Sequence, residues 1–215
     1  MALQEIPMQL STDDLPKRAA HIIEESDRRI DELFSTTENK KTPNYLPSDP
    51  EVFYRALAYL TENDLTMGKV FCEWGSGFGV CTCLAASLGY DAYGIEIESS
   101  LVEASEDLAE HLGLEVSILE TSYVPDGYES YSGVGGEYLI REDYDAVAYN
   151  LVSELRYEGM DGDISEIDVF FVYPWPYQQQ FMQELFEEIA VEGAILLAYH
   201  KSGEIYAHRK VGSNG

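Results

Sequence analysis

Short apolar runs alternate with amphipathic stretches along most of the chain. The apolar runs predict buried strands at residues 69–72, 91–98, 116–119, 168–172, 194–199 and 205–211. Stretches with apolar residues three or four positions apart predict helices at residues 11–34, 50–60, 80–88, 100–113, 144–157 and 178–191. Because strands and helices alternate, we expect a doubly wound α/β domain with a mostly parallel sheet.

The first predicted helix stands apart from the rest. It is capped by Ser11 or Thr12, carries an apolar stripe, and is followed by a polar linker that ends at Asn44. The stripe fits packing on the core or pairing with a second copy in a homodimer. We therefore divide the chain into an N-terminal helix and linker, 1–44, and a cofactor-binding domain, 45–215.

Candidate chemistry appears where the first buried strand meets a helix. The segment Glu73-Trp74-Gly75-Ser76-Gly77-Phe78-Gly79 places three alternating glycines between them. Such glycines allow a tight turn and close approach of a ligand to the backbone. A dinucleotide fingerprint would need glycine at position 80, which is Val80. Glu73 would also repel a pyrophosphate and attract an ammonium group.

A second acid follows at the expected distance. Glu96, followed by Ile97, lies near the end of the next predicted strand, about 20 residues after the glycines, where a carboxylate can accept hydrogen bonds from ribose hydroxyls. With these two acids and the glycine motif, the chain resembles the class I S-adenosylmethionine-dependent methyltransferases. The alternative is a glycine turn that binds nothing, or that binds another nucleotide.

The resemblance implies roles for particular residues. It assigns the methionine part of the cofactor to Glu73 and the glycine loop, and the ribose to Glu96. Ser122 stands where the family usually has an acid that contacts the adenine amino group, and a serine can still accept a hydrogen bond. The family sheet has seven strands with a final antiparallel hairpin, so we expect six or seven strands here.

The end of the fourth parallel strand of this family faces the transferred methyl group. Here it reads Tyr173-Pro174-Trp175-Pro176, which keeps two prolines and an aromatic of the amino-methylating pattern but lacks its acid or amide. Tyr173 is our candidate catalytic and substrate-binding residue, and Trp175 a candidate pocket wall. A rigid turn capped by an aromatic explains the same residues. His200, just after the fifth strand, is a second catalytic candidate, although histidine at a strand end is more often structural.

Two further segments are expected near the substrate. Tyr45 precedes Ser48-Asp49-Pro50-Glu51, and the resemblance places such a segment over the cofactor, so Tyr45 is a candidate substrate-binding residue. Ser48 either joins that site or caps the helix that follows. The insertion 123–166 begins with a stretch rich in glycine and tyrosine, which fits a lid over the substrate or a surface loop.

Composition narrows the partners. The 215 residues include 40 acidic and 13 basic side chains, a formal net charge of −27. This charge repels phosphate backbones and anionic membranes and attracts a cationic cofactor or an amine. We therefore expect a small-molecule or protein methyl acceptor, and neither nucleic acid nor membrane as a partner. A solubilising acidic surface explains the same charge.

Cysteine usage and hydropathy suggest the compartment. Cys72, Cys81 and Cys83 fall in the predicted core, an odd number that fits buried free thiols better than a disulfide framework. A metal pair formed by the last two lacks a second ligand cluster, so no metal is implied. No apolar run approaches the roughly 20 residues that span a bilayer, and we expect a cytoplasmic protein.

The sequence therefore favours an S-adenosylmethionine-dependent methyltransferase that acts on a nitrogen or oxygen nucleophile. A non-catalytic nucleotide- or cofactor-binding protein of the same fold is the alternative from another class. A nicotinamide-dependent oxidoreductase fits less well because of the glycine spacing and Glu73.

Overall fold

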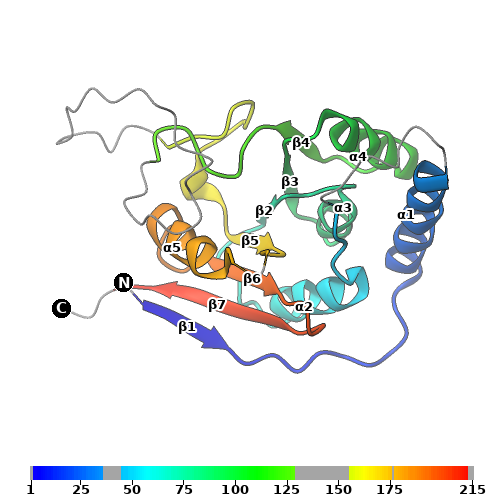
Figure 1. Cartoon of the computed structure of the whole chain (residues 1–215). Coiled ribbons are helices and arrows are strands. Elements are labelled where there is room, and N and C mark those ends of the chain that lie inside the picture. The colour runs from blue at the N-terminus through cyan, green and yellow to red at the C-terminus, as the bar shows by residue number, and fades with distance from the viewer. Residues whose placement is uncertain (1, 36–44, 129–154, 176, 213–215) are drawn as a thin grey trace.

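The fold is a three-layer α/β/α sandwich around one mixed sheet (Figure 1). The computed structural model describes residues 2–35, 45–128, 155–175 and 177–212. The strands are β1 (Ala2–Ile6), β2 (Val70–Trp74), β3 (Asp91–Glu96), β4 (Ser117–Glu120), β5 (Val169–Val172), β6 (Ile195–Tyr199) and β7 (Ile205–Val211). The helices are α1 (Lys17–Ser35), α2 (Pro50–Glu62), α3 (Val80–Ser87), α4 (Ser99–Leu112), the 3-10 helix η1 (Ile164–Glu166) and α5 (Gln179–Ile189).

The sheet has the strand order β1-β7-β6-β5-β2-β3-β4. The five strands from β6 to β4 are parallel, and β7 runs antiparallel to β6. The edge strand β1 pairs antiparallel with β7, so it runs parallel to the central strands. The doubly wound, mostly parallel sheet is therefore confirmed, with seven strands.

The seventh strand comes from an unexpected place. Residues Ala2–Ile6 lie in the polar start of the chain, which carries no strand pattern of its own, and they pair with the last strand, residue for residue, from Ala2 opposite Val211 to Ile6 opposite Ala207. The partner strand, rather than local periodicity, selects the extended conformation here.

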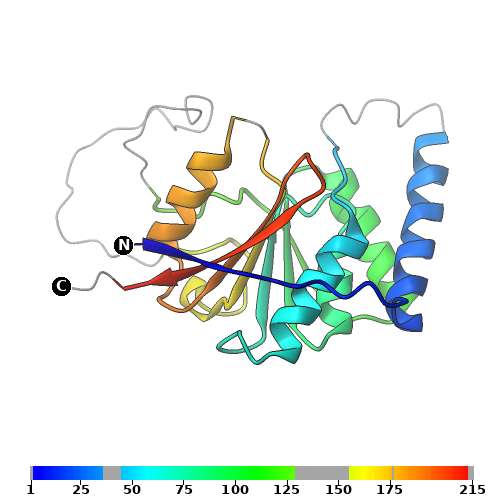
Figure 2. The same cartoon turned by 90° about the horizontal axis from the view of Figure 1, so that it is seen from below.

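Each face of the sheet has its own apolar core. Helices α2, α3 and α4 cover one face, and α1 packs against α3 on the outside of that layer (Figure 2). Phe53 of α2 lies with its ring centroid 4.5 Å from Phe171 and 5.6 Å from Phe71. The other face is covered by α5 and residues 155–167, where Phe186 packs edge-on against Phe170. Burial on both faces explains why the central strands are almost wholly apolar.

Helix starts differ from the predictions in two places. Helix α1 begins at Lys17, so its predicted start at Ser11 is wrong. Ser11 Oγ instead accepts a hydrogen bond from the Asp13 N–H, and Pro16 disfavours helical geometry at the residue before it. Helix α2 is capped by Asp49, whose side chain accepts the N–H groups of residues 51 and 52.

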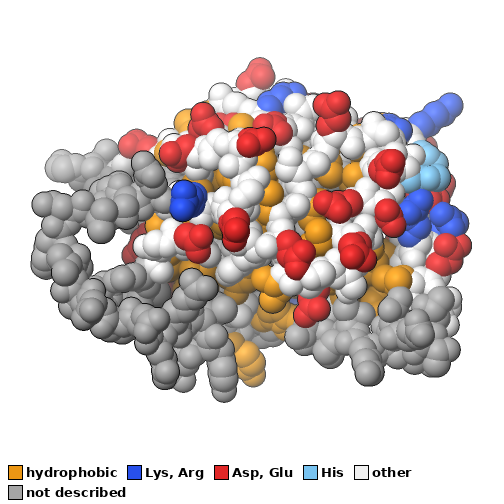
Figure 3. All heavy atoms as spheres, turned by 90° about the horizontal axis from the view of Figure 1, so that it is seen from above, with side chains coloured by type: hydrophobic (Ala, Val, Ile, Leu, Met, Phe, Trp, Pro, Cys, Tyr) orange, Lys and Arg blue, Asp and Glu red, His pale blue; other side chains and the backbone are white. Residues whose placement is uncertain are grey.

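The surface is acidic, as the composition requires. Figure 3 shows Asp and Glu side chains spread over one face of the molecule, with fewer Lys and Arg among them. In the described ranges, no helix has both the length and the apolar character to cross a membrane.

Candidate cofactor-binding site

The glycine loop is a tight turn between β2 and α3. Gly75, Gly77 and Gly79 all have positive φ, at 73°, 54° and 67°. Such backbone angles are strained for residues with a Cβ. The N–H groups of Gly75 and Ser76 both donate to the Ile95 carbonyl at 2.9 Å, which ties the start of the loop to the neighbouring strand β3.

Glu73 lies on β2 directly before this loop and is buried. One of its oxygens, Oε2, accepts hydrogen bonds from the Thr82 hydroxyl at 2.6 Å and from the Thr82 N–H at 2.9 Å. Burial raises the pKa of Glu73 to about 8, against the lowering effect of the Thr82 hydrogen bonds. A cation placed beside Glu73 would stabilise its ionised form.

Glu96 ends β3 and holds its carboxylate against the loop. Its Oε2 accepts the Gly77 N–H at 2.9 Å, and its Oε1 accepts the N–H groups of Ile97 at 2.8 Å and Glu98 at 3.0 Å. A carboxylate offers about four acceptor positions. Three are used here, so Glu96 is fixed in place and still has capacity for a ligand hydroxyl.

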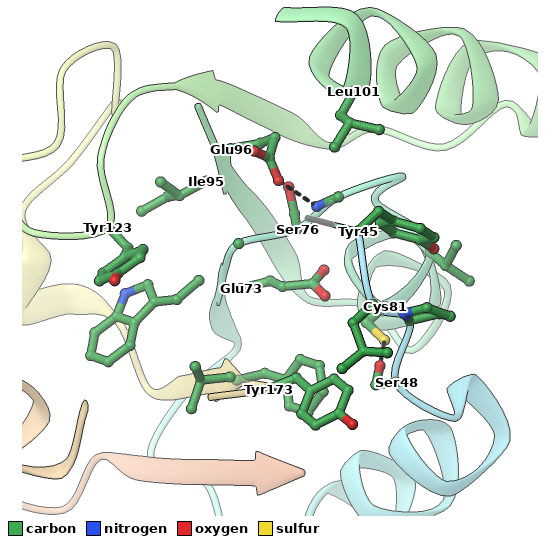
Figure 4. A pocket seen from close by; sticks show the side chains of 18 of the residues that line it. Tyr45, Ser48, Glu73, Ser76, Cys81, Ile95, Glu96, Leu101, Tyr123 and Tyr173 are labelled. Carbon is green, nitrogen blue, oxygen red and sulfur yellow. Dashed lines mark hydrogen bonds between the residues drawn. The ribbon is translucent and has the colours of Figure 1, made fainter. Parts of the chain in front are cut away.

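Both acids face one pocket of about 480 Å³ at the carboxyl ends of β2, β3 and β5 (Figure 4). Such a position, at the strand ends of an open parallel sheet, is where ligands bind in doubly wound folds. Of the residues that we predicted, the pocket is lined by Tyr45, Glu73, Gly75, Ser76, Gly77, Glu96, Ile97, Tyr173 and Trp175.

A segment from the N-terminal third forms one wall. Tyr45 lies so close to the loop that a Cβ added at Gly77 would sit 2.7 Å from its ring, and it packs edge-on against Phe78 with ring centroids 4.7 Å apart. Ser48 also lines the pocket, with its hydroxyl 3.5 Å from the Cys81 thiol. Ser48 therefore faces the site, while the capping role passes to Asp49.

Three predicted site residues lie outside the pocket lining. Gly79 is the N-cap of α3, where an added Cβ would meet Ser105. The Ser122 hydroxyl accepts the Val124 N–H at 3.1 Å, and the pocket is lined instead by its neighbours Thr121 and Tyr123. His200 Nδ1 lies 3.3 Å from the Gln179 side-chain amide. Burial lowers the His200 pKa.

Other site residues were missed from the sequence. Asp27 lines the pocket from α1, and Thr82 holds Glu73. The sequence pattern does mark Asp27. It lies four residues after Ile23 and three before Ile30, so a charged residue interrupts the apolar stripe of its helix. No sequence pattern marks Thr82, apart from its place in an apolar helix. Most of the predicted lid, residues 129–154, lies outside the described residues.

The charges of the pocket are one-sided. Asp27, Glu73, Glu96 and Glu98 contribute carboxylates, and no Lys, Arg or His is found among the described residues of the lining. Partial burial raises the pKa of Asp27, and the nearby Asp31 raises it further. A ligand with at least one positive charge is electrostatically favoured here.

The sequence and the structure give different results when they are compared with known proteins. The sequence matches no protein-family model and no curated protein. The structure is similar to that of an RNA methyltransferase from Salinibacter ruber in complex with S-adenosyl-L-homocysteine, with 18% identity and a TM-score of 0.52 over 79% of this chain and 96% of that one. This chain has the fold of the class I methyltransferases.

Two larger proteins are also similar in structure. One is an S-adenosylmethionine-dependent methyltransferase from Thiobacillus denitrificans, with 18% identity and a TM-score of 0.45 over 86% of this chain and 56% of that one. The other is a 16S rRNA methyltransferase from T. thermophilus, with 12% identity and a TM-score of 0.48 over 80% of this chain and 45% of that one.

These comparisons correct one prediction. We expected no nucleic acid among the partners because of the net charge of −27. The methyltransferase from Salinibacter ruber, which this chain covers almost completely, is an RNA methyltransferase, so the exclusion is wrong. The physical reason is that net charge is a property of the whole surface, so it does not by itself exclude a class of acceptor for one site.

Proposed function

We propose that this protein transfers a methyl group from S-adenosylmethionine to a nitrogen or oxygen nucleophile. The observation that carries the proposal is the placement of Glu73 and Glu96, at the ends of adjacent strands and beside one glycine loop, in a single pocket. The class I methyltransferase fold supports it.

The residues present fit this cofactor. Gly75 faces open space, with no atom within 4 Å of an added Cβ, so a ligand can approach the backbone there. Ser76 lines the pocket, and its buried hydroxyl has no hydrogen-bond partner among the described residues. That hydroxyl lies beside Gly94 of β3, so a ligand would meet Ser76 through its other atoms.

The charges and polarity of the lining residues indicate which of them would hold each part of the cofactor. Glu73 would bind the ammonium group of the methionine part, and Glu96 the ribose hydroxyls. Ile95, Ile97 and Leu101 offer an apolar surface for the adenine. Asp27 and the other carboxylates would favour the positively charged sulfonium.

When bound, S-adenosylmethionine supplies a methyl group that is activated by the positive sulfur and is open to in-line attack by a lone pair. The chain's own contribution is to position the two reactants and to exclude water. Tyr173, at the end of β5, lines the pocket and lies edge-on to Tyr199, with ring centroids 5.0 Å apart. Its hydroxyl is our candidate for orienting the nucleophile. His200 is not part of this proposal because it lies outside the lining.

A transfer assay tests the proposal. The protein is incubated with methyl-labelled S-adenosylmethionine and a cell extract, and the label is then measured in the small-molecule, protein and RNA fractions. We expect label in one fraction with the native chain and its loss with Glu96→Ala. Cofactor binding without transfer to any fraction would identify a non-catalytic binding protein and overturn the proposal.

A further inference from the structure

The candidate pocket has two chemically different halves. One half, formed by Asp27, Glu73, Glu96 and Glu98, is acidic. The other half lies toward α5, and we call it the aromatic half. It is formed by Tyr123, Trp175, Gln178 and Met182, none of which carries a charge at neutral pH. Figure 4 shows Tyr123 and Tyr45 on opposite sides of Glu73, with Tyr173 below Glu73 and near Ser48.

The aromatic half lies beyond the part that the cofactor would fill. Glu73 and Glu96 fix the two ends of that part through their positions on β2 and β3. Trp175 follows β5, on the other side of β2, and Gln178 and Met182 belong to the start of α5. A methyl acceptor therefore has this half of the pocket as its natural site.

The walls of the aromatic half favour a flat ring. Trp175 lines the pocket and is 46% exposed, so the described residues leave part of a large aromatic side chain uncovered. Met182, which also lines the pocket, is buried in the core around α5. Flat rings stack on such aromatic faces with little loss of side-chain freedom.

Polar groups in this half are neutral and few. Burial raises the pKa of Tyr123, and the nearby Gln178 side chain lowers it. An amide and a hydroxyl close together can read donor and acceptor positions on the edge of a ring. They offer little to a cation, because the described residues of this half contain no carboxylate.

A cationic acceptor is disfavoured for a second reason. In the proposed reaction the acceptor touches a sulfonium, and two positive charges in contact repel strongly in a pocket of low dielectric constant. The carboxylates that would offset this repulsion lie in the acidic half. A neutral acceptor avoids this cost.

We propose that the methyl acceptor is an uncharged, planar aromatic ring that stacks on Trp175 in the aromatic half. This inference rests on the proposed function and narrows its substrate class. The ring is either a free small molecule or a base displayed by RNA, since both present the same chemistry.

Binding to the product-loaded protein tests the inference. The chain is first saturated with S-adenosylhomocysteine, which is checked by calorimetry, and acceptor binding is then measured by ligand-observed NMR. The planar probes are indole, resorcinol and guanosine. The cationic aliphatic probes are putrescine and spermidine, and a short single-stranded oligoribonucleotide is the RNA arm.

We expect planar probes or the oligoribonucleotide to bind, and Trp175→Ala to weaken that binding by about tenfold or more. Trp175→Phe should restore most of it, because it keeps an aromatic face. Met67→Ala is the matched control, since Met67 is also exposed but precedes β2 at the opposite end of the strand. Neither variant at position 175 should change the affinity for S-adenosylhomocysteine by more than about twofold.

The proposed function and the inference about the acceptor are overturned by different results. If S-adenosylhomocysteine does not bind at all, the proposed function itself fails. If it binds but the polyamines bind more tightly than every planar probe and the oligoribonucleotide, or if Trp175→Ala leaves ring binding unchanged, only the inference about the acceptor is overturned. The arm that binds more tightly, free ring or RNA, identifies the source of the ring.

Discussion

The Glu96 carboxylate accepts the backbone N–H of Gly77 at 2.9 Å. This hydrogen bond joins the end of β3 to the middle of the glycine loop, so the acid that would bind the ribose also holds the loop that would bind the methionine part. A change at Glu96 therefore affects the glycine loop, and a change in the loop affects Glu96. Two sequence motifs about 20 residues apart therefore form one structural unit.

Glu96→Ala should weaken S-adenosylmethionine binding by tenfold or more. Hydrogen bonds to a charged acceptor contribute about 1.5–3 kcal/mol each, and about 1.4 kcal/mol corresponds to a factor of ten. Isothermal calorimetry measures the change. Glu120→Gln is the control, because Glu120 ends the neighbouring strand β4 but accepts a hydrogen bond from Ser99 outside the pocket lining. If Glu96→Ala and the native chain bind S-adenosylmethionine with equal affinity, Glu96 does not bind the ribose.

Alanine at the two loop glycines should have different effects. At Gly77 the added methyl group meets Tyr45 at 2.7 Å and φ is 54°, so both collision and backbone strain destabilise the fold. At Gly75 only the strain applies, and the methyl group points into open space. We expect Gly77→Ala to lose about 1 kcal/mol or more of unfolding free energy beyond the loss in Gly75→Ala, measured by urea denaturation.

Ligand binding gives the complementary result for the same pair. Gly75→Ala should weaken S-adenosylhomocysteine binding strongly although its loss of stability is small. The reason is that its methyl group occupies the space of the ligand. Similar stability losses in the two variants would show that Tyr45 moves aside easily.

The stability of the fold should depend on the protonation of Glu73. Its pKa is raised from 4.5 to about 8 in the folded protein, so the folded state holds a proton that the unfolded state has released. The stabilising contribution is full below about pH 4.5 and is lost as the pH rises toward about 8. The native chain should therefore lose up to about 1.4 kcal/mol per pH unit in this window relative to Glu73→Gln.

Urea denaturation of both proteins at about pH 5.5 and about pH 8 measures this difference. Comparison with Glu73→Gln removes the contribution of the other titrating groups, because these are shared. A difference in unfolding free energy that is independent of pH would mean that Glu73 ionises normally in its buried position.

Cofactor binding should release a proton near neutral pH. Glu73 is mostly protonated at pH 7, and an ammonium group beside it would favour the ionised form. The apparent binding enthalpy of S-adenosylhomocysteine should therefore differ between phosphate and Tris buffers, which take up protons with different enthalpies. Glu73→Gln should show a smaller buffer dependence, and the same dependence in both proteins would place the ammonium away from Glu73.

The sequence predicted those parts of the fold that local patterns determine. Buried parallel strands are apolar throughout, and the segment around Phe170 is recognisable for that reason. The strand Ala2–Ile6 is not, because its conformation depends on pairing with β7, more than 200 residues away. The start of α1 was misplaced because Ser11 forms a local turn rather than a helix cap.

The site was predictable to the extent that it follows the strand ends. Glu73 and Glu96 lie at the ends of apolar strands, where the glycine motif and the spacing of about 20 residues identify them. Asp27 and Gln178 come from helices whose rotation about their own axes is set by packing, so sequence spacing could not place them in the pocket. Ser122 was assigned by its place in the family motif, but its hydroxyl is used within its own turn.

A calorimetric titration of the native chain with S-adenosylmethionine and, separately, with NAD shows which cofactor the pocket binds. We expect one S-adenosylmethionine site per chain and tighter binding of this ligand than of NAD, because Glu73 can ionise beside an ammonium group, whereas a pyrophosphate offers it no positive charge. Both tryptophans of the chain line the pocket, so their fluorescence should change in the same titration. Tighter binding of NAD, or no binding of S-adenosylmethionine, would show that the pocket is not an S-adenosylmethionine site.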